Sequence, residues 1–192
     1  MCVLPLSKKQ PMSSDNELMS RVKDGDLDKL TVLYERYNRV LFGFFFKTTL
    51  DAQASEDLVH TVFFKIIKYR ERYKAEEGPF AAWMFQIAHN ANIDYYHSHK
   101  HARNEARVEE VEIRGGDDPD EDLLKKEKTR RVREALACLT ETQREVLILS
   151  RYQGMTYEEI AKILNCRVGT IKARVFRALE RLRCVYRGLE GT

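Results

Sequence analysis

Basic side chains gather near the C-terminal end of the chain at a spacing that could bind nucleic acid. Between residues 167 and 183 there are six cations and one acid, Glu180; the cations are Arg167, Lys172, Arg174, Arg177, Arg181 and Arg183. At about 100° per residue, the apolar side chains from Val168 to Leu182 share one side of a helix. The opposite side and its flanks hold Thr170, Ala173, Arg174, Arg177 and Arg181, with Lys172 and Phe176 beside them. Cations neutralise phosphates and forked Arg donors match guanine edges, so the pattern predicts a DNA-binding face. A solvated amphipathic helix is the alternative, but it would normally mix its charges more evenly.

The residues before this helix predict the tight turn that would place it in a major groove. Thr156 and Glu159 have the spacing of a capping box, which begins a helix that runs to Leu164. Asn165 tolerates the left-handed conformation that a turn requires. A second helix is expected from about Val168 to Val185. Residues 156–183 therefore predict a helix-turn-helix.

Charge also divides the chain into blocks. Residues 104–122 hold two basic and nine acidic side chains, whereas residues 123–192 hold 16 basic and eight acidic ones. The acidic block contains Gly115-Gly116 and no apolar stripe, so it is predicted to be an extended linker. The predicted organisation is a unit over 14–103, the linker over 104–122 and a unit over 123–187.

Both units show helical periodicity and almost no strand signal. Apolar residues recur at three- and four-residue steps through the first unit, where helices are expected over Ala54–Tyr69 and from Phe80 to about Lys100, separated by Gly78-Pro79. The second unit is expected to add helices near Leu124–Cys138 and Glu141–Arg151. The predicted fold class is all-α, with two small helical domains that have separate cores.

Composition excludes several other classes of protein. Hydrophobic residues make up 43% and charged residues 33% of the 192 residues, which does not fit a low-complexity or disordered chain. The longest apolar run, Val40–Phe46, is far shorter than a membrane span, and no secretion signal is evident. The four cysteines, Cys2, Cys138, Cys166 and Cys184, have no ligand-like spacing and indicate reduced thiols in the cytoplasm.

Nothing in the sequence has the arrangement of an enzyme active site. There is no nucleophile–base pair, phosphate-binding Gly loop or metal-ligand set, so no catalytic residue, cofactor or metal is expected. His97 and His101 share a helix face, but no carboxylate or cysteine stands beside them, and a solvated helix end near phosphates fits better. Cys166 is interpreted as a small buried residue of the turn, with a redox switch as the alternative.

Several segments resemble the extracytoplasmic-function (ECF) sigma factors of bacteria. Residues 139–147, 154–161 and 168–178 are similar to region four of that family. LuxR-type response regulators share such a helix-turn-helix, but the first unit resembles region two of the same sigma factors, in the right order. The segments that carry this likeness are Leu33-Tyr-Glu-Arg-Tyr37, Ser55-Glu-Asp-Leu-Val59 with Phe63, and Phe80-Ala-Ala-Trp83-Met-Phe-Gln-Ile-Ala88 with Asn90, Asp94 and Tyr95.

The resemblance implies a non-catalytic, cytoplasmic initiation factor whose partners are core RNA polymerase and promoter DNA. Region two would bind the clamp helices of the largest subunit through Glu56, Asp57, His60 and Thr61. It would also capture and melt the minus-ten element with Lys74, Trp83, Asn90, Asp94, Tyr95, Tyr96 and Lys100, where a pocket with an aromatic wall offsets the cost of flipping a base. Trp83, Ile87 and Ala91 have the spacing of a core stripe, so Trp83 fits packing better than the pocket.

By the same resemblance, region four would rest on the flap of the second-largest subunit and read the minus-thirty-five element with the basic face described above. Its residues are Arg167, Thr170, Lys172, Ala173, Arg174, Phe176, Arg177 and Arg181. The resemblance leaves an anti-sigma factor open as a further partner and implies no membrane insertion. A DNA-binding regulator that uses only the second unit, and an enzyme built on the first, are the rival interpretations.

Three departures from the family pattern stand out. His60-Thr61 replaces Gln followed by an acid, which removes an acid and an amide from the expected clamp surface. Arg167 replaces the Ser or Thr that usually caps the recognition helix, at a cost of ~1 kcal/mol. Thr140 replaces a common Pro and is expected to change little.

Overall fold

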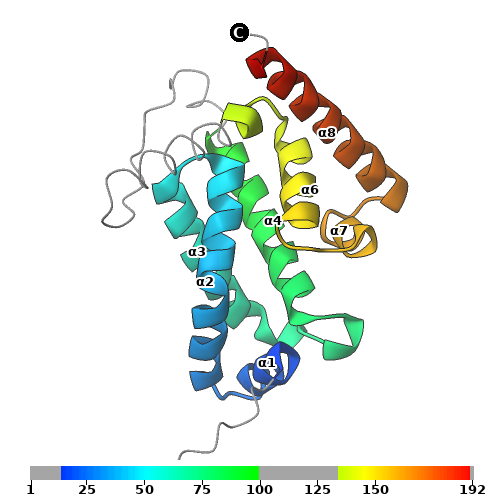
Figure 1. Ribbon diagram of the computed structural model, residues 1–192. Helices are drawn as coiled ribbons and strands as arrows, with labels where there is room; N and C mark the ends of the chain where they lie inside the picture. The colour runs from blue at the N-terminus through cyan, green and yellow to red at the C-terminus, as the bar shows by residue number, and fades with distance from the viewer. Residues whose placement is uncertain (1–13, 100–133, 191–192) are drawn as a thin grey trace, which may run out of the picture.

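The computed structural model describes residues 14–99 and 134–190, with the side chains of the latter range described as far as Cys184. Its helices are α1 (Asp15–Lys23), α2 (Asp28–Thr49), α3 (Ala52–Tyr69), α4 (Phe80–His99), α6 (Glu141–Arg151), α7 (Tyr157–Ile163) and α8 (Val168–Glu190), with 3₁₀ turns at Arg70–Arg72 and Ala75–Glu77. Residues 134–137 are also helical, and no strand occurs in the two described ranges. The predicted all-α class is confirmed (Figure 1). The acidic segment 104–122, Lys100 and His101 lie outside the described residues.

Helices α1–α4 form a bundle whose interior is filled by aromatic rings. Helix α2 packs on α3 and α1, and α3 packs on α4. Phe44 and Phe85 meet edge to face with ring centroids 5.4 Å apart, and Phe45 lies beside Phe44. All three side chains are buried. Such edge-to-face pairs add to the free energy of area burial, so this cluster fixes the spacing of α2 and α4.

The connection between α3 and α4 is fixed by Tyr73, whose side chain is 2% exposed. Its ring lies 5.3 Å from that of Trp83, and its backbone carbonyl accepts a hydrogen bond from Lys23 Nζ at 2.9 Å. Gly78 has φ = 147°, a backbone conformation that side chains rarely adopt, directly before the turn into α4. The residues between Tyr73 and Phe80 are therefore held by a buried aromatic anchor at each end.

The second unit contains the predicted helix-turn-helix. Thr156 and Glu159 form both hydrogen bonds of a capping box, and Asn165 has φ = 45°, as its turn position requires. Helix α8 extends to Glu190, five residues beyond the predicted end. Thr140 also caps its helix, α6, in a reciprocal pair with Gln143, a cap that was not predicted.

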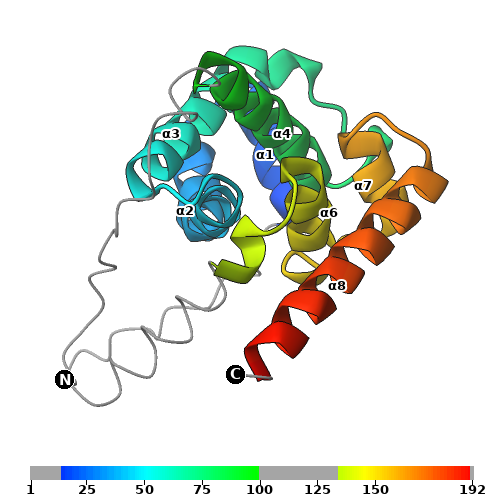
Figure 2. The same cartoon turned by 90° about the horizontal axis from the view of Figure 1, so that it is seen from above.

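The two units pack against each other, and the expectation of separate cores is wrong. Helix α6 contacts α2, and α7 contacts α4. One continuous cluster of buried side chains runs from α1–α4 into α6, α7 and α8, while a smaller cluster around Leu136, Leu139, Leu147 and Ala178 belongs to the second unit alone. In both views α6 lies between the α1–α4 bundle and α8 (Figures 1 and 2). Apolar periodicity on α6 shows that a face is buried, but not which helix covers it.

Candidate nucleic-acid interface

Helix α8 divides into a buried side and an exposed side, as its sequence predicts. Ile171, Val175 and Ala178 are buried, while Val168 and Leu182 are half-buried. The opposite side exposes Ala173, Arg177 and Arg181, with Arg167, Lys172 and Phe176 also exposed and Thr170 and Arg174 half-buried. The Phe176 side chain is 64% exposed. An exposed aromatic ring among cations can stack on a base or contact a thymine methyl group, in addition to the phosphate contacts of the cations.

Several of these arginines also have partners within the protein. Arg177 Nε donates to the carbonyl of Ala173 at 3.2 Å, one turn back on its own helix. Arg181 Nε donates to the carbonyl of Cys138 at 2.6 Å, and Arg183 forms an ion pair with Glu180 at 2.6 Å. Arg181 therefore ties α8 to the segment before α6, so a substitution there changes packing as well as charge.

The residues expected at the minus-ten element do not form one group. Lys74 lies in the connection before α4, is exposed, and donates to Glu77 at 2.7 Å; this hydrogen bond raises the pKa of Lys74 above its ordinary value. Trp83 is half-buried in the aromatic cluster with Tyr73 and Phe80, which agrees with the packing interpretation. Asn90 is exposed on α4. Tyr96 is half-buried and its hydroxyl donates to the carbonyl of Thr48, so it joins α4 to the end of α2.

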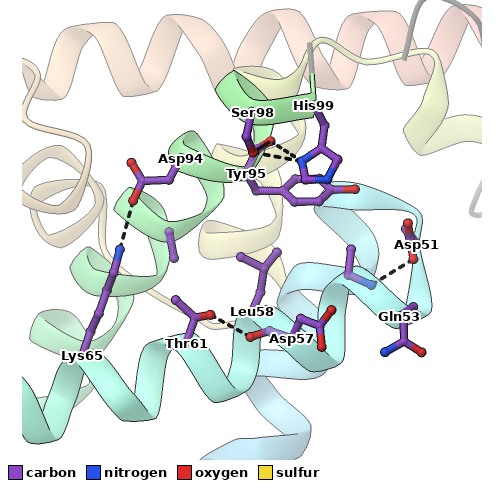
Figure 3. Close-up of a pocket in the computed structure, with 12 residues that line it drawn as sticks. Asp51, Gln53, Asp57, Leu58, Thr61, Lys65, Asp94, Tyr95, Ser98 and His99 are labelled. Carbon is purple, nitrogen blue, oxygen red and sulfur yellow. Dashed lines mark hydrogen bonds and ion pairs between the residues drawn. The ribbon is translucent and has the colours of Figure 1, made fainter. Parts of the chain in front are cut away.

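Asp94 and Tyr95 lie instead in a pocket of about 590 Å³ between α3 and α4, where they meet two of the expected clamp residues, Asp57 and Thr61 (Figure 3). Asp94 forms an ion pair with Lys65 of α3 at 3.0 Å. Tyr95 stacks on His99 with ring centroids 4.3 Å apart. The pocket is lined by three carboxylates, those of Asp51, Asp57 and Asp94, and by one lysine. This charge balance suits a basic protein side chain better than a phosphate.

The expected clamp residues occupy the exposed face of α3. Glu56, Asp57 and His60 are exposed, and Thr61 is half-buried with its hydroxyl donating to the carbonyl of Asp57 at 2.8 Å. Glu56 and His60 line a second groove, of about 330 Å³, formed with α2. Sequence reasoning missed Phe64, which is 65% exposed one turn further along the same helix. Periodicity could have found it, because Phe64 lies about 200° around the helix from Val62, which is on the buried face.

Sequence reasoning also missed the polar residues between the two units, which are buried. Arg144 and Glu145 of α6 are 4% and 5% exposed, and they reach Thr48 of α2 and His89 of α4 respectively. In the sequence they look like solvated charges on an amphipathic helix. Their role in joining the two units becomes clear only from their partners, Thr48 and His89, which are distant in the sequence.

Three further findings concern metal binding, cysteines and membrane spans. Within residues 14–99 and 134–190, no three His, Cys, Asp or Glu side chains come together as a metal ion would require, and His101 lies outside that range. Cys166 is half-buried in the turn, whereas Cys138 and Cys184 are exposed. No helix in the described part of the chain is both long and apolar enough to cross a membrane.

Comparison with known families gives two matches, in the order that the fold shows. Sigma-70 region 2 matches residues 33–102, and Sigma-70, region 4 matches residues 129–182. A helical bundle followed by a helix-turn-helix, each with its own sigma-70 region, defines a sigma factor of transcription initiation. Proteins of this class are not themselves catalysts; they confer promoter specificity on transcription.

Curated relatives narrow the class. RNA polymerase sigma-H factor of Pseudomonas aeruginosa is 27% identical over 175 residues, which cover 86% of this chain and 90% of that protein. ECF RNA polymerase sigma-E factor of Haemophilus influenzae is 28% identical over 176 residues, covering 87% and 92%. ECF RNA polymerase sigma factor SigK of Mycobacterium tuberculosis is 28% identical over 181 residues, covering 90% and 94%. The chain belongs to the ECF sigma factors.

Solved structures show the same fold. CnrH, solved in complex with the cytosolic domain of CnrY, matches with a TM-score of 0.71 at 21% identity, over 92% of this chain and 99% of that one. RpoE of Bartonella quintana, solved with the anti-sigma factor NepR, matches with a TM-score of 0.64 at 25% identity, over 82% and 96%.

Proposed function

We propose that this ECF sigma factor binds core RNA polymerase through region two and directs it to promoters by reading the minus-ten and minus-thirty-five elements. The observation that supports this most is the outward basic face of α8, which follows α7 after the left-handed turn at Asn165. A helix of this kind enters a major groove with its exposed side chains toward base edges. Polymerase and promoter DNA are therefore the proposed partners, and the cytoplasm is the proposed compartment.

The proposed polymerase surface is the exposed face of α3. Glu56, His60 and Phe64 are spaced four residues apart and are all exposed, so they form one stripe of an acid, an imidazole and an aromatic ring. A large exposed aromatic ring in a polar surround is the kind of residue that carries binding energy in protein interfaces. The adjoining acidic pocket would receive basic side chains of the clamp helices, so we assign Asp94 to this surface as well as to the minus-ten element.

The proposed melting surface is the exposed side of α4 next to the anchored connection from Tyr73 to Phe80. Asn90 offers an amide to an unstacked base, and Lys74 offers a cation to the backbone. A flipped base costs a few kcal/mol to unstack, and hydrogen bonds of this kind offset that cost. The exposed position of Asn90 supports this role.

An anti-sigma factor is proposed as a further partner. The support is the likeness to RpoE of Bartonella quintana, which was solved with such a factor. A protein of this kind would have to leave α3 and α8 before polymerase and promoter bind.

Run-off transcription with purified core polymerase tests the proposal. Arg177→Ala removes an exposed cation from the basic face, and Arg151→Ala is the matched control, because Arg151 is exposed at the end of α6. Loss of a base contact costs ~1–3 kcal/mol, so promoter binding through the minus-thirty-five element should fall about 5- to 150-fold. Polymerase binding should be unchanged. Unchanged transcription by Arg177→Ala would remove α8 from promoter recognition, and tight binding to duplex promoter DNA without polymerase would favour a plain DNA-binding regulator.

A further inference from the structure

We propose that α1 is a positioning element for minus-ten recognition. Its residues Asn16 and Lys23 hold the two ends of the 74–79 loop, which joins Tyr73 to the start of α4 at Phe80, so that this loop keeps one shape before DNA arrives. The inference rests on the proposed function, because that function places the loop and the adjoining side of α4 at the minus-ten element.

The end of the loop that enters α4 is held by Asn16. The first backbone N–H groups of a helix have no partner within the helix, and a side-chain oxygen of the residue before the helix usually accepts from one of them. Pro79, which directly precedes α4, has no such oxygen. Instead, Asn16 Oδ1 accepts a hydrogen bond from the N–H of Phe80 at 2.8 Å, across 64 positions of sequence. Helix α4 is thus capped by a side chain of α1.

The end of the loop that follows α3 is held by Lys23. Its Nζ donates to the carbonyl of Tyr73 at 2.9 Å, in a partly buried position. A charged donor makes a stronger hydrogen bond than a neutral one, and shielding from water strengthens it further. The ring of Tyr73 is buried against that of Trp83. Tyr73 is therefore fixed through its backbone as well as through its side chain.

Both contacts come from one face of α1. Asn16 and Lys23 are about two helical turns apart, so their side chains point in nearly the same direction, about 10 Å apart along the axis. Met19 lies between them on this face and is fully buried. Helix α1 packs on α4 and on the 3₁₀ turn Arg70–Arg72 that leads into the loop (Figure 1). A helix with two attachment points fixes the separation of the loop's ends as well as their positions.

Helix α1 is itself fixed to the bundle without help from the loop. Asp15 accepts hydrogen bonds from Arg36 at 2.5 Å and from the hydroxyl of Tyr37 at 2.6 Å, and both of these residues belong to α2. Ser14 and Glu17 form a capping box at the start of α1. The helix can therefore act as a support for the loop, because its own position is set by α2.

The loop has little packing of its own. None of residues 74–79 is buried. Lys74 and Glu77 form an ion pair at 2.7 Å, but the two side chains are 54% and 66% exposed, and an exposed pair of this kind contributes little stability. The loop's shape therefore depends mainly on how its two ends are held.

A loop that is ordered beforehand loses less conformational freedom when it meets DNA. That loss is one of the costs of association, and preorganisation reduces it. Of the proposed minus-ten contacts, Lys74 lies on the loop and Asn90 on α4, so both depend on the point where α4 begins. Release of either end of the loop should weaken capture of an unstacked base and leave the surfaces of α3 and α8 unchanged.

Proteolysis of the full chain measures how firmly the loop is held. A glutamate-specific protease cleaves after Glu76 or Glu77 when the loop opens locally, and the rate then follows the open population. Asn16→Ala removes a neutral hydrogen bond and should raise this cleavage about 3- to 10-fold, whereas Lys23→Met removes a charged one and should raise it about 10-fold or more. Asn16→Asp keeps the acceptor and should stay near the wild type. Mass spectrometry identifies the bonds that are cut.

Glu17→Ala is the matched control for a purely structural role of α1. It breaks the exposed capping box of the same helix and leaves both contacts with the loop in place. Loop cleavage in this variant should therefore stay near that of the wild type. If it rose as much as in Asn16→Ala, α1 would act only on the stability of the bundle, and the positioning role would be wrong.

Promoter opening gives the functional measurement, followed by permanganate reactivity on a promoter that the wild type transcribes. Asn16→Ala and Lys23→Met should lower the opening rate at saturating polymerase about 3- to 10-fold. The polymerase concentration for half-maximal rate should not change, because closed complexes form through α3 and α8. Asn16→Asp should restore the rate.

Unchanged loop cleavage in both variants, or raised cleavage with wild-type opening, would overturn the inference. Lys23→Met decides the matter if Asn16→Ala does not fold. If the wild type transcribed no promoter, the proposed function would be wrong, and the cleavage rates would still decide whether α1 holds the loop.

Discussion

Arg144→Met is the substitution whose effect on stability follows most directly from the structure. The guanidinium of Arg144 is buried and donates to three backbone carbonyls, two in its own unit and one, that of Thr48, in region two. Met fills a similar volume with no donor. Hydrogen bonds from a charged donor contribute about 1.5–3 kcal/mol each. Removing Arg144 also removes the cost of burying its charge, which offsets part of the stability lost with these bonds.

We therefore expect the free energy of unfolding to fall by about 3 kcal/mol, because buried carbonyls lose the donor that satisfied them. In the variant the carbonyl of Thr48 still accepts a hydrogen bond from the hydroxyl of Tyr96, which limits the loss of stability at this carbonyl. For a chain of this size, a change of about 3 kcal/mol lowers Tm by roughly 6–12 °C. Urea unfolding followed by circular dichroism measures the first quantity, and calorimetry the second.

Two further variants separate charge from geometry. Arg144→Lys keeps the positive charge but not the planar fork that reaches three acceptors, so it should recover only part of the loss. Arg151→Met removes an exposed arginine from the same helix and should change stability by less than about 0.5 kcal/mol. If Arg144→Met were as stable as Arg151→Met, the three hydrogen bonds would carry no net stability and the reasoning would be wrong.

Three other substitutions have defined outcomes. Asn90→Ala should impair promoter opening, measured by permanganate reactivity, more than closed-complex formation; equal loss in both would remove Asn90 from melting. Thr156→Ala breaks the capping box with Glu159 and should cost ~1 kcal/mol in urea unfolding, with no change if the box adds nothing to the helix-turn-helix. Burial, and then the hydrogen bond to Asp15, raise the pKa of Tyr37 well above its ordinary value, so its phenol should stay protonated where exposed tyrosines ionise. Absorbance titration near 295 nm of wild type and Tyr37→Phe, both still folded, should then coincide through pH 10–11, and a clear difference there would contradict the buried hydrogen bond.

Local features of the fold could be predicted from the sequence because their causes are local. The cap at Thr156, the left-handed turn at Asn165 and the two sides of α8 each depend on residues within one or two helical turns. The cap at Thr140 has the same kind of signal, a Thr followed three residues later by Gln, although it was not predicted. Helix ends were less predictable, since α8 continues past Val185 without a stop signal.

The packing between the two units could not be predicted, because its causes are not local. His89 and Glu145 are 56 positions apart, and Arg144 and Thr48 are 96 apart. Each of the charged residues, taken alone, is typical of a solvated helix face. The acidic block over 104–122 suggested separate modules, but a linker between two units sets no requirement that they stay apart. The same limit applies to Asp94, whose ion pair with Lys65 depends on how α3 and α4 lie side by side.

The composition of the face between the units fits a contact that forms and breaks. If the two units separated, a wholly apolar face on α6 would become an exposed hydrophobic patch, and such patches favour aggregation. Arg144 and Glu145 would instead regain hydration if the two units separated, so separation would cost less than for an apolar interface of the same area. In the structure their partners, the Thr48 carbonyl and His89, compensate their burial. Contacts between domains within a chain are generally more polar than permanent interfaces for this reason. Arg144 and Glu145 are therefore what we expect at a contact between two domains of one chain.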